Sequence, residues 1–138
     1  SIVDTIGTLL CLWNMNITTV TCSRLPLGEG TVWTDHGLMP VPAPATLRLM
    51  VDMPTCSGPP GITGELVTPT AAALLKTLVA SCAPAAIGAA RKTTQGKGDG
   101  RPPNFTIRKV GIGAGTKNFH KHPNILRLLV GDTIVAKS

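Results

Sequence analysis

The sequence has 138 residues, enough for one domain with a hydrophobic core, and a formal net charge of +6. It contains no Tyr, two Phe and two Trp; because single-strand nucleic-acid binders need aromatic stacking platforms, we expect no nucleic-acid partner. Residues 91–138 carry ten Lys and Arg against two Asp, a balance that suits an anionic small molecule, a nucleotide or an acidic partner, or simply a solvated surface.

Neither a secretory signal nor a membrane span is predicted. The N-terminus lacks a basic start and a small-residue cleavage site, and Lys76 and Pro84 interrupt the most apolar stretch, residues 71–90. The four cysteines are scattered without a C-x-x-C pair, which argues against a zinc site. We expect a cytoplasmic, reduced protein with no membrane partner. The opening at Ser1, inside a helical pattern, suggests a fragment of a longer protein.

Three elements are predicted in the first third of the chain. Apolar residues recurring at i, i+3, i+4 and i+7 predict a helix over residues 1–14. The β-branched residues 17–24 predict a strand, and the "LPLGEG" run, residues 25–30, predicts a turn.

A hairpin is predicted next, with extended arms at Thr31–Trp33 and Leu38–Val41. Gly37 can adopt the positive φ that the connecting turn needs. Pro40 and Pro42 lack a backbone N–H, so they are expected on an edge strand or in polyproline II conformation.

Proline and threonine then mark two helix starts. Pro44 suits the first turn of a short helix, and Thr68 followed by Pro69 is an N-cap hydroxyl before proline at the first helical position. The elements predicted here are a helix over 44–51, a loop over 54–64, a short strand over 65–67 and a helix from 69 to about 82.

The last part is predicted to contain two strands. Residues 88–103 are rich in Gly, Lys and Pro without apolar periodicity, which predicts a flexible insertion. Thr106–Ile112 and Ile125–Val130 are the two strands. Helices and strands mixed without regular βαβ alternation predict one α+β domain over 1–138, a two-layer sandwich of short strands with two or three helices.

The "GIGAGT" run, residues 111–116, contains Gly113 and Gly115 and is followed by Lys117. It is neither a Rossmann fingerprint, because no helix follows, nor a P-loop, because the Lys comes after the Thr. An anion bound by the backbone N–H groups of such a turn is one interpretation, and a glycine-rich bulge is the plainer one.

His120 and His122 lie two residues apart, so in an extended segment they would share a face and could chelate Ni²⁺, Zn²⁺ or Cu²⁺. No third ligand is near in sequence, and a solvated basic loop is the favoured interpretation.

His36 is the favoured metal-binding candidate. Asp35 beside it could orient the imidazole, and the prolines that follow restrict the backbone, as expected of a preorganised site. Glu65 precedes the helix that begins after Thr68, and it could act as a cap or a metal ligand. Thr68 and Thr70 are explained as capping residues, although an anion at this helix start would also contact them.

Three long blocks, residues 26–50, 64–78 and 110–131, resemble the signature blocks of the LarC family of nickel insertion proteins. They read "PLGEGTVWTDHGLMPVPAPATLRLM", "GELVTPTAAALLKTL" and "VGIGAGTKNFHKHPNILRLLVG". "SIVDTIG" at residues 1–7 is similar to the lead-in helix of the family. The blocks occur in the family's order and cover nearly the whole chain outside residues 84–103.

This resemblance implies an enzyme, a nickel-inserting lyase, that places nickel into pyridinium-3,5-bisthiocarboxylic acid mononucleotide to make the cofactor of lactate racemase. The complete protein would hydrolyse CTP with Mn²⁺ or Mg²⁺, bound beyond Ser138, so the fragment alone is expected to be inactive. We predict that metal binds at His36 and Asp35, and the cofactor precursor at Glu65, Thr68, Thr70, Gly113, Gly115 and Lys117. A homo-oligomer and a lactate racemase-like recipient are left open as partners.

The chain departs from the family where Ala71 replaces the usual glycine, which removes a bare backbone that substrate could approach. His120 and His122 also depart from the usual residues and are poor carriers of a family-wide role. Two other functions stay open: a structural or oligomerisation module that supports a C-terminal nucleotide-binding domain, and a nucleotide-binding module built on residues 111–117.

Overall fold

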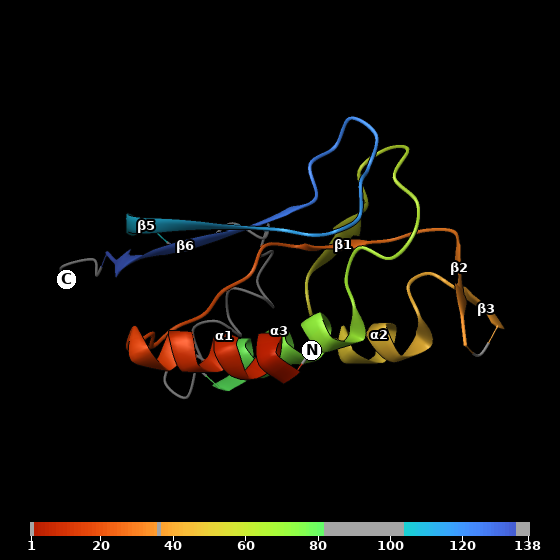
Figure 1. The fold of residues 1–138 in the computed structure, drawn as a ribbon. Helices are drawn as coiled ribbons and strands as arrows, with labels where there is room; N and C mark the ends of the chain where they lie inside the picture. The colour runs from red at the N-terminus through yellow and green to blue at the C-terminus, as the bar shows by residue number, and fades with distance from the viewer. Residues whose placement is uncertain (1, 36, 82–103, 135–138) are drawn as a thin grey trace. The chain divides into compact units, whose positions relative to one another are not determined.

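The structure is a computed structural model that describes residues 2–35, 37–81 and 104–134. Contacts divide the chain into two compact units, residues 1–100 and residues 101–138. The first unit contains α1 (Ile2–Asn14), β1 (Leu25–Leu27), β2 (Thr31–Thr34), β3 (Gly37–Pro40), α2 (Pro44–Leu49), β4 (Thr55–Ser57) and α3 (Pro69–Ser81), and the second contains β5 (Phe105–Ala114) and β6 (Ile125–Thr133) (Figure 1). Helices and short strands in this order confirm the α+β class. The predicted insertion at 88–103 lies outside the described residues.

The predicted N-terminal helix is confirmed as α1, and its end is a Schellman motif. Asn16 adopts the left-handed conformation (φ 52°), its N–H donates to the carbonyl of Trp13, and the N–H of Ile17 donates to that of Leu12 at 3.1 Å. Asparagine is one of the few residues besides glycine that tolerates this position. No residue of α1 is buried, so its apolar stripe is solvent-exposed in this chain.

The strand predicted for residues 17–24 is wrong, because these residues form no regular structure. The strand begins at Leu25 instead, where β1 pairs in parallel with β4 and Leu25 lies opposite Thr55. β4 in turn lies inside the predicted loop 54–64, and β1 inside the predicted turn 25–30. β-propensity without a pairing partner did not produce a strand, whereas a partner thirty residues away did.

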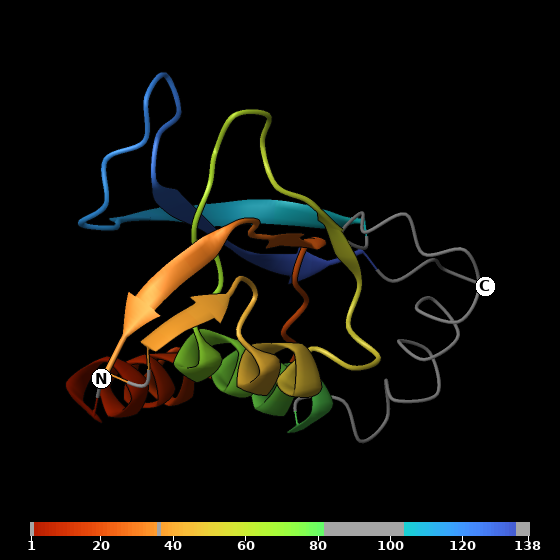
Figure 2. The same ribbon diagram turned by 90° about the vertical axis from the view of Figure 1, so that its right-hand side faces the viewer.

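The core of the first unit lies around β1, α2 and α3. Leu25, Met50 and Ala72 are buried together, and α2 contacts α3, as Figures 1 and 2 show. Further apolar side chains pack against this centre: Leu27, Leu49, Met53, Val67 and Leu75.

The predicted hairpin is confirmed as the antiparallel pair β2–β3, with Thr31 opposite Pro40 and Thr34 opposite Gly37. Gly37 has the expected positive φ, 95°, and Pro40 lies on a strand with one partner, as an edge proline must. Pro42 follows the strand through a cis peptide bond after Val41.

Both predicted helix starts are confirmed. Pro44 opens α2, and the N–H of Ala71 donates to Thr68 Oγ1 at 3.2 Å, the N-cap bond of α3. The strand predicted for residues 65–67 is wrong: Leu66 and Val67 form bends, and Glu65 has no regular structure. Among the described helices, none combines the length and apolar content that crossing a bilayer requires.

The second unit is a two-stranded antiparallel ribbon in which both predicted strands are confirmed and extended. β5 pairs with β6 from Phe105–Thr133 to Ala114–Ile125, with a register shift between Ile107 and Lys109. Arg108 occupies the shift and pairs through Nε with Asp132 Oδ2 at 2.6 Å. The bulge explains the added residue on β5.

Candidate functional site

The metal-binding candidate His36 lies outside the described residues, and its two neighbours are described. Asp35 is exposed in the β2–β3 turn. Thr34 Oγ1 donates to the carbonyl of Gly37 at 3.0 Å, across the turn. The β2–β3 register and this bond restrain the backbone at Thr34 and at Gly37.

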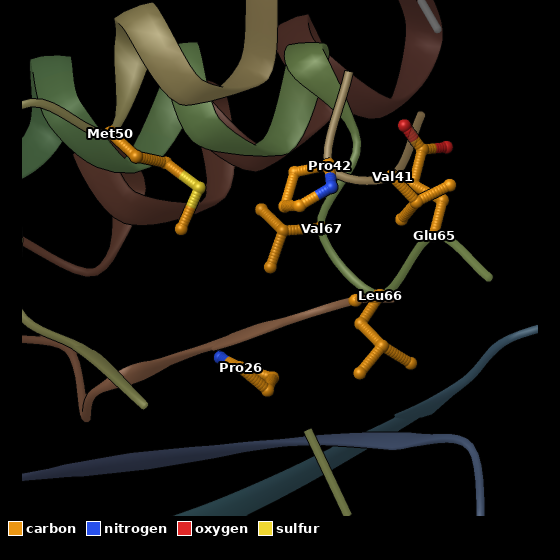
Figure 3. A pocket seen from close by; sticks show the side chains of 8 residues that line it. Pro26, Val41, Pro42, Met50, Glu65, Leu66 and Val67 are labelled. Carbon is orange, nitrogen blue, oxygen red and sulfur yellow. The ribbon is translucent and has the colours of Figure 1, made fainter. Parts of the chain in front are cut away.

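A small pocket lies beside the hairpin's exit, between β1, the end of α2 and residues 65–67 (Figure 3). It has no room for a water molecule, so it is a packed junction rather than a ligand cavity. Its lining residues are Pro26, Gly28, Val41, Pro42, Met50, Glu65, Leu66 and Val67.

Gly28 shows how tightly this junction is packed. A Cβ at this position would overlap the carbonyl oxygen of Gly64 and lie 2.7 Å from Val41 Cγ1. Gly64 is held there because its N–H donates to the carbonyl of Glu29 at 2.8 Å. This close approach was not predicted, and the glycine at position 28, inside "LPLGEG", was its one sequence signal.

Glu65 belongs to this junction and Asp35 does not. The Glu65 side chain is half-buried, and in Figure 3 its carboxylate points away from Pro26 at the other end of the pocket. The structure therefore joins Glu65 to Val41 and Pro42, which directly follow the hairpin, but it does not gather Glu65 and Asp35 in one pocket.

The start of α3 offers few groups to an anion. Thr68 and Thr70 are both exposed, but Thr68 Oγ1 already accepts the N–H of Ala71. Pro69, at the first helical position, has no N–H to donate. The capping role predicted for Thr68 is thus realised, and it uses one of the donors that an anion would need.

The glycine-rich run does not form an open turn. Gly113 lies inside β5 opposite Leu126, and the N–H of Gly115 donates to the carbonyl of Asn124 at 2.9 Å. Lys117 is exposed, and its carbonyl accepts the side-chain amide of Asn124 at 3.1 Å. Lys117 is the one cationic residue of this set.

Cysteine chemistry contributes no metal centre in the described part of the chain. Cys11, Cys22 and Cys56 are unpaired thiols, and burial raises the pKa of the Cys22 thiol, which favours its protonated form. Within residues 2–35, 37–81 and 104–134, no three His, Cys, Asp or Glu side chains gather closely enough to hold a metal ion.

Comparisons with known proteins agree with the resemblance of the three blocks. A family model described as nickel insertion protein matches residues 1–102 and 88–138. Proteins provisionally named as nickel insertion proteins are similar: one of Geobacter metallireducens is 43% identical over 132 residues, and one of Myxococcus xanthus is 41% identical over 131 residues. The alignments cover 96% and 95% of this chain, but 29% and 28% of those relatives.

A relative of the same name from Rippkaea orientalis (strain PCC 8801 / RF-1) is 38% identical over 133 residues, which is 96% of this chain and 27% of that protein. The chain thus spans less than a third of the length of the curated relatives it matches. No solved structure matches it significantly.

Proposed function

The chain belongs to the nickel insertion protein family, and from this premise we propose that it is part of an enzyme that places nickel into pyridinium-3,5-bisthiocarboxylic acid mononucleotide. The product would be the nickel-pincer cofactor of lactate racemase. The observation that carries the proposal is the family match over the length of the chain, which includes the hairpin block with Asp35 and His36.

Nickel is the cargo of this reaction, and we assign its transient binding to the hairpin turn. Imidazole and carboxylate are ligands that a borderline ion such as Ni²⁺ accepts, and they release it to softer sulfur donors of the precursor. Asp35 would orient His36 or share the ion. The prolines after the turn limit backbone freedom, which lowers the entropy lost when the ion binds.

The precursor's phosphate needs cationic or N–H donors. We assign Lys117 to that contact, with Gly113, whose Cβ position has no neighbour within 4 Å, allowing close approach along β5, and Gly115 following the strand. Glu65 would bind metal and not the phosphate, because its carboxylate repels an anion. Thr68 and Thr70 would offer hydroxyl groups at the start of α3.

CTP with Mn²⁺ or Mg²⁺ would be bound by residues of the complete protein outside this chain. This assignment is supported by the resemblance of the three sequence blocks to the family. A lyase activity of this chain in isolation is therefore not part of the proposal.

Nickel calorimetry on the complete protein tests the assignment of the hairpin. His36→Ala should lower nickel affinity at least about tenfold, since an imidazole ligand is lost. The matched control is Asp52→Asn, which removes an exposed carboxylate elsewhere in the first unit and keeps a residue that tolerates the positive φ at that position, 68°. Equal nickel affinity of wild type and His36→Ala would remove His36 from the site.

One observation favours the second candidate, a structural or oligomerisation module. Large apolar side chains of α1 are exposed, among them Val3 at 82% and Trp13 at 78%, and exposed apolar stripes of this kind usually mark an interface. If α1 serves only assembly, Trp13→Ser would change the oligomeric state of the complete protein in sedimentation and leave nickel affinity unchanged.

A further inference from the structure

The loop between β5 and β6 is built as a closed, hydrogen-bonded structure. At its base, the N–H of Gly115 donates to the carbonyl of Asn124 at 2.9 Å, and the Asn124 side-chain amide donates to the carbonyl of Lys117 at 3.1 Å. At its tip, Phe119 and His122 form an antiparallel bridge. These hydrogen bonds therefore hold the backbone of the loop tip in a defined conformation.

The tip is a tight turn that carries His120, Lys121 and His122. The N–H of His122 points to the carbonyl of Phe119 at 3.5 Å, and Lys121 adopts a left-handed φ of 58°, which lysine rarely does outside such turns. Two Cα–Cα steps leave His120 and His122 at most about 7 Å apart at their Cα atoms. A separation of this size does not prevent both imidazoles from reaching one ion.

The ring of His122 is oriented as in many metal sites. Its Nδ1 lies 3.0 Å from the carbonyl oxygen of Pro123, and a carbonyl oxygen can only accept, so Nδ1 carries the proton. In the neutral ring, Nε2 then has the lone pair. Histidine ligands of metals commonly donate their second ring N–H to a backbone carbonyl in this way. Both histidine side chains are exposed.

We propose that His120 and His122 form a two-imidazole docking site for Ni²⁺ at the tip of the β5–β6 loop. The choice of nickel as the ion rests on the proposed function. The geometry of the loop tip is observed independently of that function. Imidazole nitrogens bind Ni²⁺, Cu²⁺ and Zn²⁺ and discriminate against Mg²⁺ and Mn²⁺. Water would fill the coordination positions that the two imidazoles leave open.

Such a site binds its ion weakly and exchanges it readily. Two protein ligands are fewer than the three or four of a resident metal centre, and the nearby positive charges of Lys117 and Lys121 oppose a divalent cation. These properties suit a position where cargo metal is first captured and then passed on, rather than one where it is stored.

Nickel titration of the isotope-labelled complete protein, followed by NMR of the imidazole resonances, tests the proposal. Paramagnetic Ni²⁺ should broaden the rings of His120 and His122 together, and the nitrogen shifts of His122 should report protonation at Nδ1. Broadening of neither ring at stoichiometric nickel, or a His122 ring protonated at Nε2, would overturn it. An amide fingerprint spectrum of each variant verifies its fold.

Calorimetry of His120→Ala, His122→Ala and the double variant separates a chelate from independent sites. In a chelate, each single substitution lowers nickel affinity by about tenfold or more, and the double variant is little worse than either single one. Two independent histidines would instead lose half of the binding stoichiometry with unchanged affinity, and that result would contradict the proposal.

Lys121→Gly is the matched control. It keeps both imidazoles, relieves the left-handed residue and removes one positive charge, so nickel affinity should stay equal or rise. A loss of affinity equal to that of His120→Ala would show that the turn, and not the pair of rings, determines binding. If the complete protein makes no nickel cofactor while nickel still binds at His120 and His122, the proposed function is wrong. The proposed site is then unaffected.

Discussion

Gly28 and Gly64 approach so closely that no side chain fits between them: a Cβ on Gly28 would overlap the carbonyl oxygen of Gly64. The contact joins the segment after β1 to the segment that carries Glu65. Because Gly64 is also bonded to the carbonyl of Glu29, its carbonyl has little room to move. The close packing of the junction next to the hairpin therefore requires glycine, which has no Cβ, at position 28.

Gly28→Ala should lower the free energy of unfolding by about 1–3 kcal/mol, as overpacking does in well-packed regions. Urea unfolding followed by circular dichroism measures the change. The matched control is Gly7→Ala, since Gly7 lies within α1 and nothing surrounds its Cβ position within 4 Å. That substitution should stabilise the chain by up to about 1 kcal/mol. Similar effects of the two substitutions would contradict the close approach.

Thr68→Ala should cost about 1 kcal/mol, because the N–H of Ala71 loses its acceptor. Thr68→Ser retains a hydroxyl and should lie within a few tenths of a kcal/mol of wild type. Thr70→Ala is the control: it removes a hydroxyl at an exposed position beside the cap. It tests whether the loss of any hydroxyl in this turn lowers the free energy of unfolding. A Thr70→Ala effect as large as that of Thr68→Ala would mean that Thr68 is not the cap.

Cys22 should react slowly with alkylating reagents at neutral pH. Burial raises the pKa of its thiol above the ordinary 9.0, so the reactive thiolate forms only at higher pH. Cys11 is exposed and should be alkylated first. Peptide mapping by mass spectrometry after short labelling at several pH values reads both sites, and faster labelling of Cys22 than of Cys11 would refute the assignment.

The same shift predicts a pH effect on stability. The folded chain binds the Cys22 proton more tightly than the unfolded chain does, so this contribution is fully present below pH 9.0 and is lost as pH rises through the raised folded pKa. The free energy of unfolding of wild type should therefore fall more steeply above pH 9.0 than that of Cys22→Ala. Parallel curves for the two proteins would contradict a raised pKa.

The elements that sequence reasoning predicted are those with local signals. The period of α1, the glycine of the β2–β3 turn and the Thr68 cap each lie within a few residues of the structure they determine. β1 and β4 were missed because their pairing joins Leu25 to Thr55. The β-branched residues 17–24 had the propensity for a strand but no partner.

In the candidate site, too, features set by local sequence were predicted, and features set by contacts between distant segments were not. Asp35 lies in the predicted turn because the turn is local, whereas the closeness of Gly28 to Gly64 depends on a contact between distant segments. Gly113 was expected in a glycine-rich bulge or in an anion-binding turn, but pairing with Leu126 holds it in β5. The spacing of the glycines alone did not distinguish a residue paired in a β-ribbon from a residue in an anion-binding loop.

Asp35→Asn tests whether this carboxylate orients His36 in the complete protein. If it does, nickel affinity should fall about 10–100-fold, which is the usual cost of losing a partner that positions a metal ligand. The loss should be smaller for Asp35→Glu, which keeps the charge. Asp52→Asn, the control described above, should bind nickel like wild type, and an equal loss in that variant would point to a general effect of charge.

The most direct test of the account is formation of the nickel product by the complete protein. Purified protein is incubated with the pyridinium bis-thiocarboxylate mononucleotide, nickel, CTP and Mn²⁺, and the nickel-bound product is measured by mass spectrometry. We predict product with wild type and with Asp52→Asn, and at least about tenfold less with His36→Ala. Absence of product with folded wild-type protein, or full product with His36→Ala, would contradict the account.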